Sequence, residues 1–438
     1  VKSQTGSGKT AAFGIPICEA IELEEKAPQA LVLTPTRELA VQVKEDLAHL
    51  GRFKRIRCAA VFGKQSYDIQ KNELKQRVHV VVGTPGRTID HIDRGNLNLE
   101  RIKYLVIDEA DKMLDMGFID QVEAVIAALP KKRVTMLFSA TMPDVVKQIC
   151  EKYMLKPRVV EVEAPISNTE KIEQFYYQIE EVEKFGLVKK LIFTEKPESC
   201  VLFCNTREKV EYVIEKLKHE RFHCEALHGG MEQTARLEVM NSFKRGEFHF
   251  LVATDVAARG IHIEDVTHVI NYDLPLEEES YVHRIGRTGR VEKSGMAMTF
   301  VTPFEFKFLE RLEDYLGYKL TIREIPSDED VREGRMDYEE IILKRPKKKE
   351  LKSAALNREI TRFRINAGKK NKMRPGDILG AITSIRDVSA DMIGIIDVQD
   401  TCSYVEIFGD KANFIIETLK NTKIKRKLQT VKKVSFRT

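Results

Sequence analysis

Short apolar runs alternate with helix-forming stretches over the first three-quarters of the chain. Each run is rich in Val, Ile, Leu or Phe, which is typical of strands buried on both faces of a parallel sheet. The runs lie at 30–34, 79–83, 103–108 and 133–139, and then at 199–204, 249–255, 267–273 and 295–301. Between the two sets, Pro, Ser and Asn break the pattern over 163–174. We therefore predict two α/β domains, at 1–163 and 170–325, joined by a short linker.

The pattern changes again after Pro326. The segment 326–359 contains SDED and KRPKKKELK without periodicity, which predicts an exposed linker. Residues 360–438 predict a strand, a helix, two strands, a helix and a last strand, with Asp410 as the N-cap of the second helix. This order is that of the ferredoxin-like α+β fold used by RRM-type modules.

The charge of the chain is distributed unevenly between these parts. The net charge is +5, but the residues from Lys344 onward carry 23 Lys and Arg against 10 Asp and Glu. The net charge of this tail is therefore +13, and that of the preceding residues is −8. A basic appendage on an acidic body favours an anionic partner, with a merely solubilising tail as the alternative. No apolar run approaches the ~20 residues of a membrane span. We expect a monomeric cytoplasmic protein, and its seven cysteines, without a CxxC pair, favour reduced core thiols over a disulfide framework or a zinc site.

The first motif with chemical content is SQTGSGKT, at residues 3–10. Gly6 and Gly8 let backbone N–H groups approach phosphate oxygens, and Lys9 can reach the β- and γ-phosphates. The Thr10 hydroxyl can hold Mg²⁺. The general pattern has a small residue, usually glycine, where this chain has Ser3. A glycine turn beside a helix is the alternative. The other members of the predicted nucleotide site are Gln4, Thr5 and Ser7.

A second motif, LVIDEAD at 105–111, places acidic residues at the end of an apolar strand. Asp108 would lie at the carboxyl edge of the sheet, where Mg²⁺ is held opposite a phosphate loop. Glu109 would then orient or deprotonate the attacking water. A solvated strand end is the alternative, and the phosphate loop upstream argues against it.

A third motif, HRIGRTGR at 283–290, lies in the second α/β domain. Its arginines Arg284, Arg287 and Arg290 recur at every third residue around glycines. Arginines brought from another domain can stabilise the charge of a phosphoryl-transfer transition state, and we take Arg287 and Arg290 as catalytic candidates. A basic loop that binds RNA or carboxylates is the alternative.

These motifs and five others occur in the order seen in DEAD-box RNA helicases, which residues 1–325 resemble. The others are PTREL (35–39), TPGR (84–87), SAT (139–141), QTAR (233–236) and ATDVAARG (253–260). The tail, with GKKNKMRPGDILGAI at 368–382, is similar to the C-terminal RNA-binding domain of DbpA-type helicases. The resemblance implies two RecA-like domains that close over ATP–Mg²⁺ and single-stranded RNA.

The resemblance also implies roles for individual residues. Ser139 and Thr141 would link the state of the nucleotide to domain geometry, partly through Asp111. Gly260 and His262 would lie at the nucleotide. The expected RNA path comprises Arg37, Thr84, Arg87, Gln233, Arg236 and Thr254. Contacts of this kind go mainly to phosphate and sugar, so the core is expected to be largely blind to sequence.

Specificity would come from the tail. DbpA-type tails recognise a hairpin of 23S ribosomal RNA, which implies a role in assembly of the large ribosomal subunit. Lys369, Lys370, Lys372 and Arg374 crowd one loop that can bind phosphates. The strands MIGIIDV and SYVEIF lack the aromatic RRM signature, so loop contacts are expected rather than base stacking on the sheet. A small oligomerisation domain is the alternative.

The sequence differs from the family pattern at three places. Only Val1 and Lys2 precede the phosphate loop, without the adenine-reading glutamine, so we expect the chain to be a fragment of a longer one. Lys64 stands where the family usually has glycine. His262 replaces the usual ribose-binding Asp, which predicts weaker nucleotide affinity.

Two rival functions remain open from the sequence. One is a DNA helicase or translocase, which PTREL, SAT and the RRM-like tail argue against. The other is a non-enzymatic RNA-binding scaffold, which the retained Lys9, Asp108 and Glu109 argue against.

Overall fold

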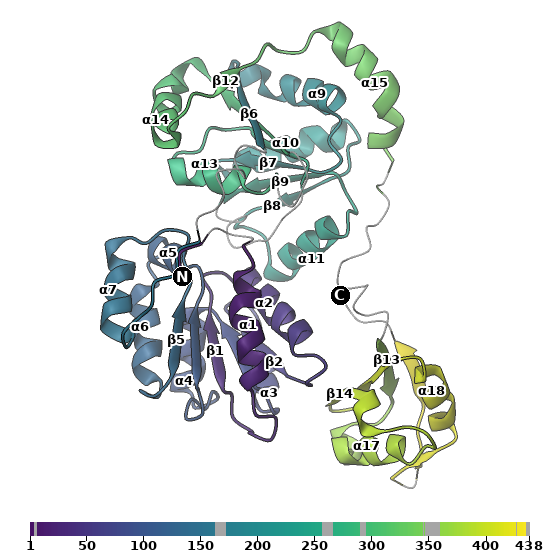
Figure 1. Ribbon diagram of the computed structural model, residues 1–438. Helices are drawn as coiled ribbons and strands as arrows, with labels where there is room; N and C mark the ends of the chain where they lie inside the picture. The colour runs from purple at the N-terminus through teal and green to yellow at the C-terminus, as the bar shows by residue number, and fades with distance from the viewer. Residues whose placement is uncertain are drawn as a thin grey trace.

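The structure is a computed structural model that describes residues 1–3, 7–162, 172–255, 266–289, 295–344, 346, 360–425 and 427–434. Three larger sheets organise these residues into a first domain (1–162), a second domain (172–344) and a C-terminal domain (360–434) (Figure 1). Two of the sheets are parallel and the third is antiparallel. The predicted class, tandem α/β domains with a small α+β domain, is therefore confirmed.

The first domain is built on a five-stranded parallel sheet in the order β2-β3-β1-β4-β5. Its strands are β1 (Ala30–Leu33), β2 (Cys58–Val61), β3 (Val80–Gly83), β4 (Tyr104–Ile107) and β5 (Val134–Leu137). Its helices are α1 (Lys9–Ala20), α2 (Arg37–Leu50), α3 (Tyr67–Leu74), α4 (Pro85–Asp93), α5 (Ala110–Asp115), α6 (Ile119–Ala128) and α7 (Asp144–Tyr153). Strands β1 to β3 are buried along their whole length, as continuous apolar runs predict. Val1–Ser3 run beside Ser139, with Ser3 N–H donating to Ser139 O at 3.0 Å.

The second domain holds a seven-stranded sheet in the order β12-β6-β11-β10-β7-β9-β8. Its strands are β6 (Ile172–Gln178), β7 (Cys200–Cys204), β8 (Cys224–Leu227), β9 (Phe250–Thr254), β10 (His268–Asn271), β11 (Gly295–Val301) and β12 (Thr321–Ile322). Its helices include α9 (Lys184–Glu195), α10 (Arg207–His219), α11 (Gln233–Lys244), α13 (Glu278–Ile285), α14 (Phe306–Leu316) and α15 (Asp328–Ile342). The 3₁₀ turns η1 (Glu181–Glu183) and η2 (Pro303–Glu305) precede α9 and α14.

Helix α15 corrects the prediction of an exposed linker from Pro326 onward. Ser327 caps the helix by accepting from Asp330 N–H, and the Asp330 carboxylate in turn accepts from Ser327 N–H. Tyr338 and Ile342 are buried in the core of the second domain. Gly334 lies against α9 so closely that a Cβ there would be 2.2 Å from the carbonyl oxygen of Phe193. The helix therefore completes the second domain through two apolar side chains and one glycine.

The C-terminal domain has an antiparallel sheet in the order β14-β15-β13-β18, covered by two helices. The elements are β13 (Ile360–Ile365), α17 (Pro375–Thr383), β14 (Ile393–Val398), β15 (Ser403–Phe408), α18 (Ala412–Lys420) and β18 (Val431–Val434), with η3 (Lys369–Asn371), η4 (Ala390–Met392) and the short pair β16 (Lys423–Ile424) and β17 (Lys427–Leu428). The βαββαβ prediction is confirmed. The N-cap of α18 is Lys411 without a side-chain cap, so the assignment of Asp410 was wrong.

None of the helices within these described ranges is long and apolar enough to cross a bilayer.

Candidate nucleotide and RNA site

The phosphate loop leads directly into α1. Gly8 is the N-cap at φ +85°, a left-handed conformation that side chains disfavour, and no side chain caps the helix. The first N–H groups of α1 are therefore open to an anion. Lys9 is buried, and its Nζ lies 3.4 Å from the carbonyl oxygen of Ser3. Ser7 Oγ lies 3.2 Å from Ser3 Oγ, while Thr10 is the second residue of the helix.

The DEAD motif follows β4, as the sequence predicts. Asp108 and Glu109 are 3% and 4% exposed, so both carboxylates are almost fully shielded from solvent. Glu109 adopts φ +55°, an uncommon conformation for a residue with a side chain, and such strain is concentrated at functional sites. Its Oε1 accepts from Lys112 Nζ at 2.9 Å in a buried ion pair. Lys112 is a member of the site that the motif search missed.

Asp111 connects the DEAD motif to the SAT motif. Its Oδ2 accepts from the N–H groups of Ala140 and Thr141 at 3.0 and 2.8 Å, and from the Thr141 hydroxyl at 3.2 Å. Ser139 Oγ in turn accepts from Asp111 N–H at 3.1 Å. The three predicted coupling residues are thus brought into one hydrogen-bonded group. A movement of either motif must be transmitted to the other or break these bonds.

The second domain brings His283 near this acidic group, with Arg287 beside it. Burial lowers the pKa of His283 to about 4; Lys112 and Arg287 add to the effect, while Asp111 and Glu109 oppose it. His283 therefore lies within electrostatic reach of the DEAD motif of the other domain. Arg287 is 6% exposed, and its Nε donates to the carbonyl oxygen of His283 at 3.1 Å. His283 opens HRIGRTGR, so that motif was the available signal for it.

Arg284 has a different position from its neighbours in the same motif. Its side chain is 1% exposed and forms a two-pronged ion pair with Asp255, with both nitrogen–oxygen distances at 2.6 Å. It also donates to Asn271, to Asn205 and to the carbonyl oxygen of Asp273. These bonds fix Arg284 inside the second domain, and it was not among the catalytic candidates. They tie α13, which carries His283, to the strand ends of the second sheet.

The two α/β domains meet through Glu38, on α2. Its Oε1 lies 3.0 Å from Arg236 Nη2 and accepts from Gln233 Nε2 at 2.9 Å. Gln233 Oε1 accepts from Arg37 Nη1 at 3.1 Å. Three residues predicted to lie on the RNA path therefore meet across the domain boundary, and burial lowers the pKa of the Arg37 guanidinium. Glu38 was missed because no rule of spacing pairs residues almost two hundred positions apart.

Other residues of the predicted RNA path lie at ends of strands and helices. Thr84 is the N-cap of α4, and Thr254 ends β9. Arg87 Nη1 donates to the carbonyl oxygen of Gln65 and to the side chain of Gln70, both at 3.2 Å. In the C-terminal domain, Lys369, Lys370, Lys372 and Arg374 are all exposed on residues 368–374, which we name the lysine loop.

Six predicted site residues lie outside the described part of the chain. They are Gln4, Thr5, Gly6, Gly260, His262 and Arg290.

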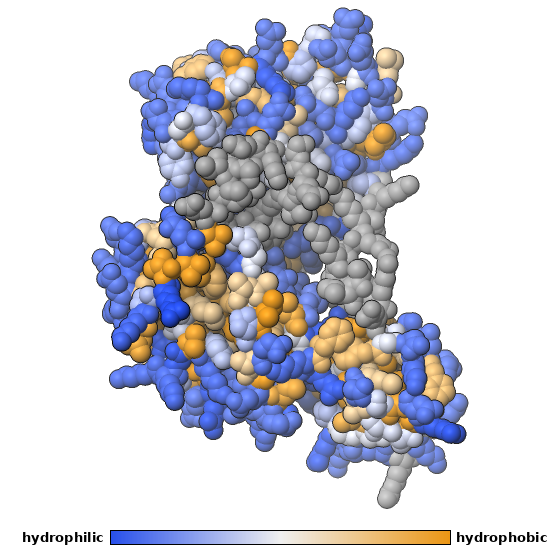
Figure 2. Space-filling view, viewed as in Figure 1, coloured by the Kyte–Doolittle hydropathy of each residue, from blue (hydrophilic) through white to orange (hydrophobic). Residues whose placement is uncertain are grey.

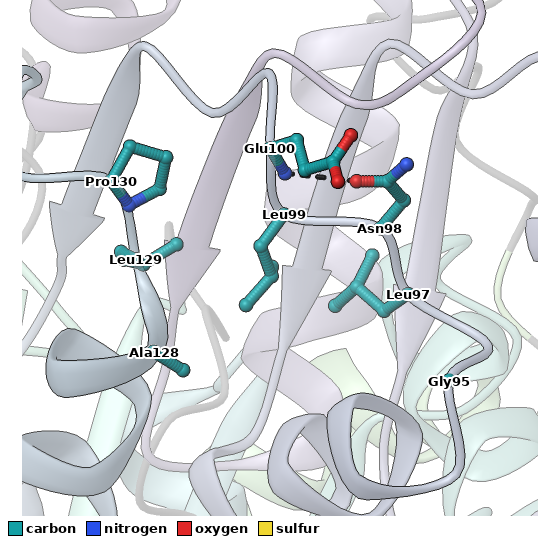
Figure 3. Close-up of a pocket in the computed structure, with 8 residues that line it drawn as sticks. All are labelled: Gly95, Leu97, Asn98, Leu99, Glu100, Ala128, Leu129 and Pro130. Atoms are coloured by element: carbon teal, nitrogen blue, oxygen red, sulfur yellow. Dashed lines mark hydrogen bonds between the residues drawn. The ribbon is translucent and has the colours of Figure 1, made fainter.

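A shallow pocket of the first domain is separate from this site. Leu97, Leu99, Leu129 and Pro130 contribute its apolar lining, next to Asn98 and Glu100 (Figure 3). These residues precede β4 and β5, whereas the DEAD and SAT motifs follow them. The pocket therefore lies at the opposite edge of the sheet.

Three known protein families match successive parts of this chain. The DEAD/DEAH box helicase family matches residues 1–149, the helicase conserved C-terminal domain matches 183–292, and the DbpA RNA binding domain matches 362–433. Among individual proteins, the ATP-dependent RNA helicase DbpA of Bacillus subtilis is 53% identical over 435 residues, covering 99% of this chain and 91% of its own. The DEAD-box ATP-dependent RNA helicase CshA of Geobacillus kaustophilus is 47% identical over 76% of this chain and 71% of its own.

Solved structures give the same result for the first two domains. S. cerevisiae Dbp5 bound to RNA and ADP BeF3 has a TM-score of 0.67 at 34% identity, covering 78% of this chain and 88% of its own. Mss116p bound to ssRNA and AMP-PNP has a TM-score of 0.65 at 29% identity, covering 79% of this chain and 73% of its own. With 91% of the DbpA relative matched at 53% identity, this chain belongs to the DEAD-box ATP-dependent RNA helicases that carry a DbpA RNA-binding domain.

Proposed function

We propose that this chain uses ATP hydrolysis to separate short RNA duplexes in 23S ribosomal RNA during assembly of the large ribosomal subunit. The observation that supports the proposal is that Glu109, Asp111 and Lys112 of the first domain act electrostatically on His283 of the second, whose carbonyl oxygen accepts from Arg287. The acid groups of one domain and the cations of the other then lie on opposite sides of one cleft. Hydrolysis at such a cleft depends on domain closure, which is what a clamp on RNA requires.

The residues present suit a nucleotide triphosphate with Mg²⁺. The uncapped start of α1 and the buried amine of Lys9 are suited to phosphate oxygens, and Thr10 with Asp108 would hold the metal, largely through water. Bound ATP would supply the γ-phosphoryl group, and Mg²⁺ the charge that bridges its oxygens. Arg287 would stabilise the negative charge of the transition state from the second domain, together with Arg290.

Glu109 is proposed to orient the attacking water and accept its proton. The ion pair with Lys112 holds its carboxylate in place at 2.9 Å, and a carboxylate is the form that accepts a proton. The strained backbone at Glu109 fixes the carboxylate beyond the end of β4. Lys112 is therefore a positioning residue, because it acts through Glu109.

RNA is proposed to lie along Arg37, Thr84 and Arg87 of the first domain and Gln233, Arg236 and Thr254 of the second. Because Glu38 joins Arg37, Gln233 and Arg236 across the boundary, RNA held there spans both domains only while they are closed. Closure driven by ATP would then bend one strand away from its complement. Asp111, with Ser139 and Thr141, would transmit the state of the nucleotide.

The lysine loop is proposed to select the RNA. Its four exposed cations are suited to phosphates at the end of a hairpin, where bases are also accessible. Ribosomal RNA of a bacterium is assembled in the cytoplasm, and we propose that compartment and a monomeric state for this chain.

The decisive experiment measures the ATPase rate against a panel of 23S ribosomal RNA fragments and DNA of equal sequence, with and without residues 360–438. The proposal expects one fragment to stimulate far more than the rest, and this preference to disappear without the C-terminal residues. Equal stimulation by DNA would favour a translocase. RNA binding without any turnover would favour a scaffold.

A further inference from the structure

The C-terminal domain lies against the first domain through a single turn. Residues 51–57, which we name the docking turn, connect α2 to β2. Arg52 Nη2 lies 3.4 Å from Glu406 Oε1, and the rings of Phe53 and Phe408 are 5.1 Å apart between centroids. Arg55 and Arg57 donate to the carbonyl oxygens of Ala390 and Ile396. Figures 1 and 2 both show the C-terminal domain beside the first domain, at the lower right.

These contacts use the outer face of the C-terminal sheet. Along β15, Ser403, Val405 and Ile407 are buried in the domain core, so the residues between them point to the other face. Gly394 on the neighbouring strand makes room for Phe408, since a Cβ there would be 2.9 Å from its ring. The face that RRM-type modules can offer to RNA is therefore covered at one end by protein.

Arginines of the docking turn lie near carboxylates of the C-terminal domain, whereas Glu73 on α3 and Asp397 are like charges within electrostatic reach of each other. The side chains of Arg52 and Glu406 are 9% and 12% exposed. Burial lowers the pKa of the Arg57 guanidinium, and Asp397 of the C-terminal domain is the largest opposing influence. Glu406 Oε2 is buried without a hydrogen-bond partner among the described residues, Arg52 lies 3.4 Å from Oε1, and Arg362 stands opposite Glu406 on β13. Removing one member of such a buried pair is costly.

Docking leaves the lysine loop exposed. The backbone N–H groups of Lys369 and Lys370 donate to the carbonyl oxygens of Gln399 and Asp400, in the turn between β14 and β15. Glu406 and Phe408 lie toward the other end of β15. The docking turn follows the last residue of α2, whereas Arg37 on the predicted RNA path is its first. At ~1.5 Å per residue, the 14 residues of α2 span about 21 Å.

We infer that the outer face of the C-terminal sheet is a protein-docking surface for the docking turn, and that it holds the lysine loop at a fixed distance from the RNA path. A hairpin bound by the loop is then presented to the closing domains at the spacing that the docked arrangement sets. The docking itself is independent of the proposed function, whereas the fixed spacing rests on it.

The first test measures docking in the full chain without RNA, by small-angle X-ray scattering and by hydrogen exchange of residues 51–57. Phe53→Asp and Arg52→Glu should each expand the molecule and expose the turn, and Arg52→Glu with Glu406→Arg should restore both. Phe53 is 64% exposed, so its replacement leaves the fold intact. Arg101→Glu, an exposed arginine of the same domain, is the matched control. Unchanged scattering and exchange in Phe53→Asp and Arg52→Glu would overturn the docking surface.

The second test measures the ATPase rate with 23S ribosomal RNA hairpins joined to a duplex through single-stranded spacers of increasing length. The wild-type chain should show a preferred spacer, and Phe53→Asp should lose this preference while binding the bare hairpin equally well. A flat wild-type profile with strong RNA stimulation would overturn the fixed spacing alone. Absence of any RNA stimulation would count against the proposed function and leave the docking result standing.

Discussion

The carboxylate of Glu38 in the first domain lies 3.0 Å from the guanidinium of Arg236 in the second, and their side chains are 5% and 12% exposed. This ion pair exists only while the domains are together. Its neighbours Arg37 and Gln233 also meet across the boundary. Closure of the domains and assembly of the proposed RNA path are therefore the same event.

Glu38→Gln should weaken closure without unfolding either domain. Loss of one charge from a buried pair costs about 3–5 kcal/mol in the closed form, whereas in the open form Arg236 can be hydrated. The expected result is at least a tenfold loss of RNA-stimulated kcat/KM with a nearly unchanged melting temperature. Glu24→Gln, whose side chain is 95% exposed, is the control. Wild-type RNA stimulation in Glu38→Gln would show that this pair does not contribute to closure.

Glu109→Gln should abolish turnover and preserve binding. The amide fills the same space beside Lys112 but cannot accept the proton of water, and general-base catalysis contributes about 10²–10⁴-fold. The measurements are the ATPase rate and the RNA affinity in the presence of a non-hydrolysable ATP analogue. Glu100→Gln changes an exposed glutamate of the same domain and should leave both unchanged. Retention of turnover in Glu109→Gln would assign the proton transfer to another group.

Lys64→Gly should raise stability and reduce the salt dependence of RNA binding. Lys64 has φ +58°, which costs a lysine about 1 kcal/mol that glycine avoids. Its loop lies between Arg37, whose guanidinium approaches Gly63, and Arg87, which donates to Gln65. If its amine contacts a phosphate, the slope of log K for single-stranded RNA against log salt concentration should decrease in magnitude by about 0.7.

Lys156→Gly provides the comparison for Lys64, because Lys156 also has a positive φ of 48° but is outside the RNA path. It should change stability in the same direction and leave the salt slope unchanged. An equal change of slope in both variants would remove Lys64 from the RNA path.

Acid should destabilise the chain through its buried histidines. Burial lowers the pKa values of His91, His268 and His283 to about 4, whereas unfolded histidine titrates near 6.5. The unfolded chain therefore binds protons that the folded chain excludes, and stability falls as the pH drops from about 6.5 to about 4. Each buried histidine contributes about 1.4 kcal/mol per pH unit within this window.

Urea unfolding midpoints between pH 7 and pH 5 provide the measurement. His268→Asn should flatten the dependence for the second domain, and His219→Asn, at an exposed position, should not. A dependence that is unchanged in His268→Asn would show that another group takes up the proton.

Much of the fold followed from the sequence because continuous apolar runs mark buried strands. Two missed strands have weak patterns: β2 reads CAAV and β8 reads CEAL, both short and poor in large apolar residues. Strand β6 (IEQFYYQ) was also missed, and it begins at Ile172, inside the segment 163–174 that was predicted to break the pattern. Helix α15 was missed for a related reason. Its contact with α9 depends partly on Gly334, and a glycine adds nothing to a hydrophobic pattern although it permits close approach.

The site was predictable where motifs are local and not where domains meet. Lys9, Asp108 and Glu109 follow from loops and strand ends that lie next to them in sequence. Glu38 and Lys112 carry charges that acquire meaning only beside Arg236 and Glu109 in the folded chain. Arg284 was left out of the catalytic candidates, and its buried ion pair with Asp255 gives it a structural position.

The central claim is that the two domains share one hydrolytic centre, with acid groups on one side and guanidinium groups on the other. Its most direct test is the single-turnover rate of ATP hydrolysis by Arg287→Ala at saturating ATP and RNA, compared with Arg311→Ala at an exposed arginine of the same domain. The account predicts a loss of about 10³-fold or more for Arg287→Ala, with nucleotide affinity changed much less, and a normal rate for Arg311→Ala. A normal rate for Arg287→Ala would contradict it.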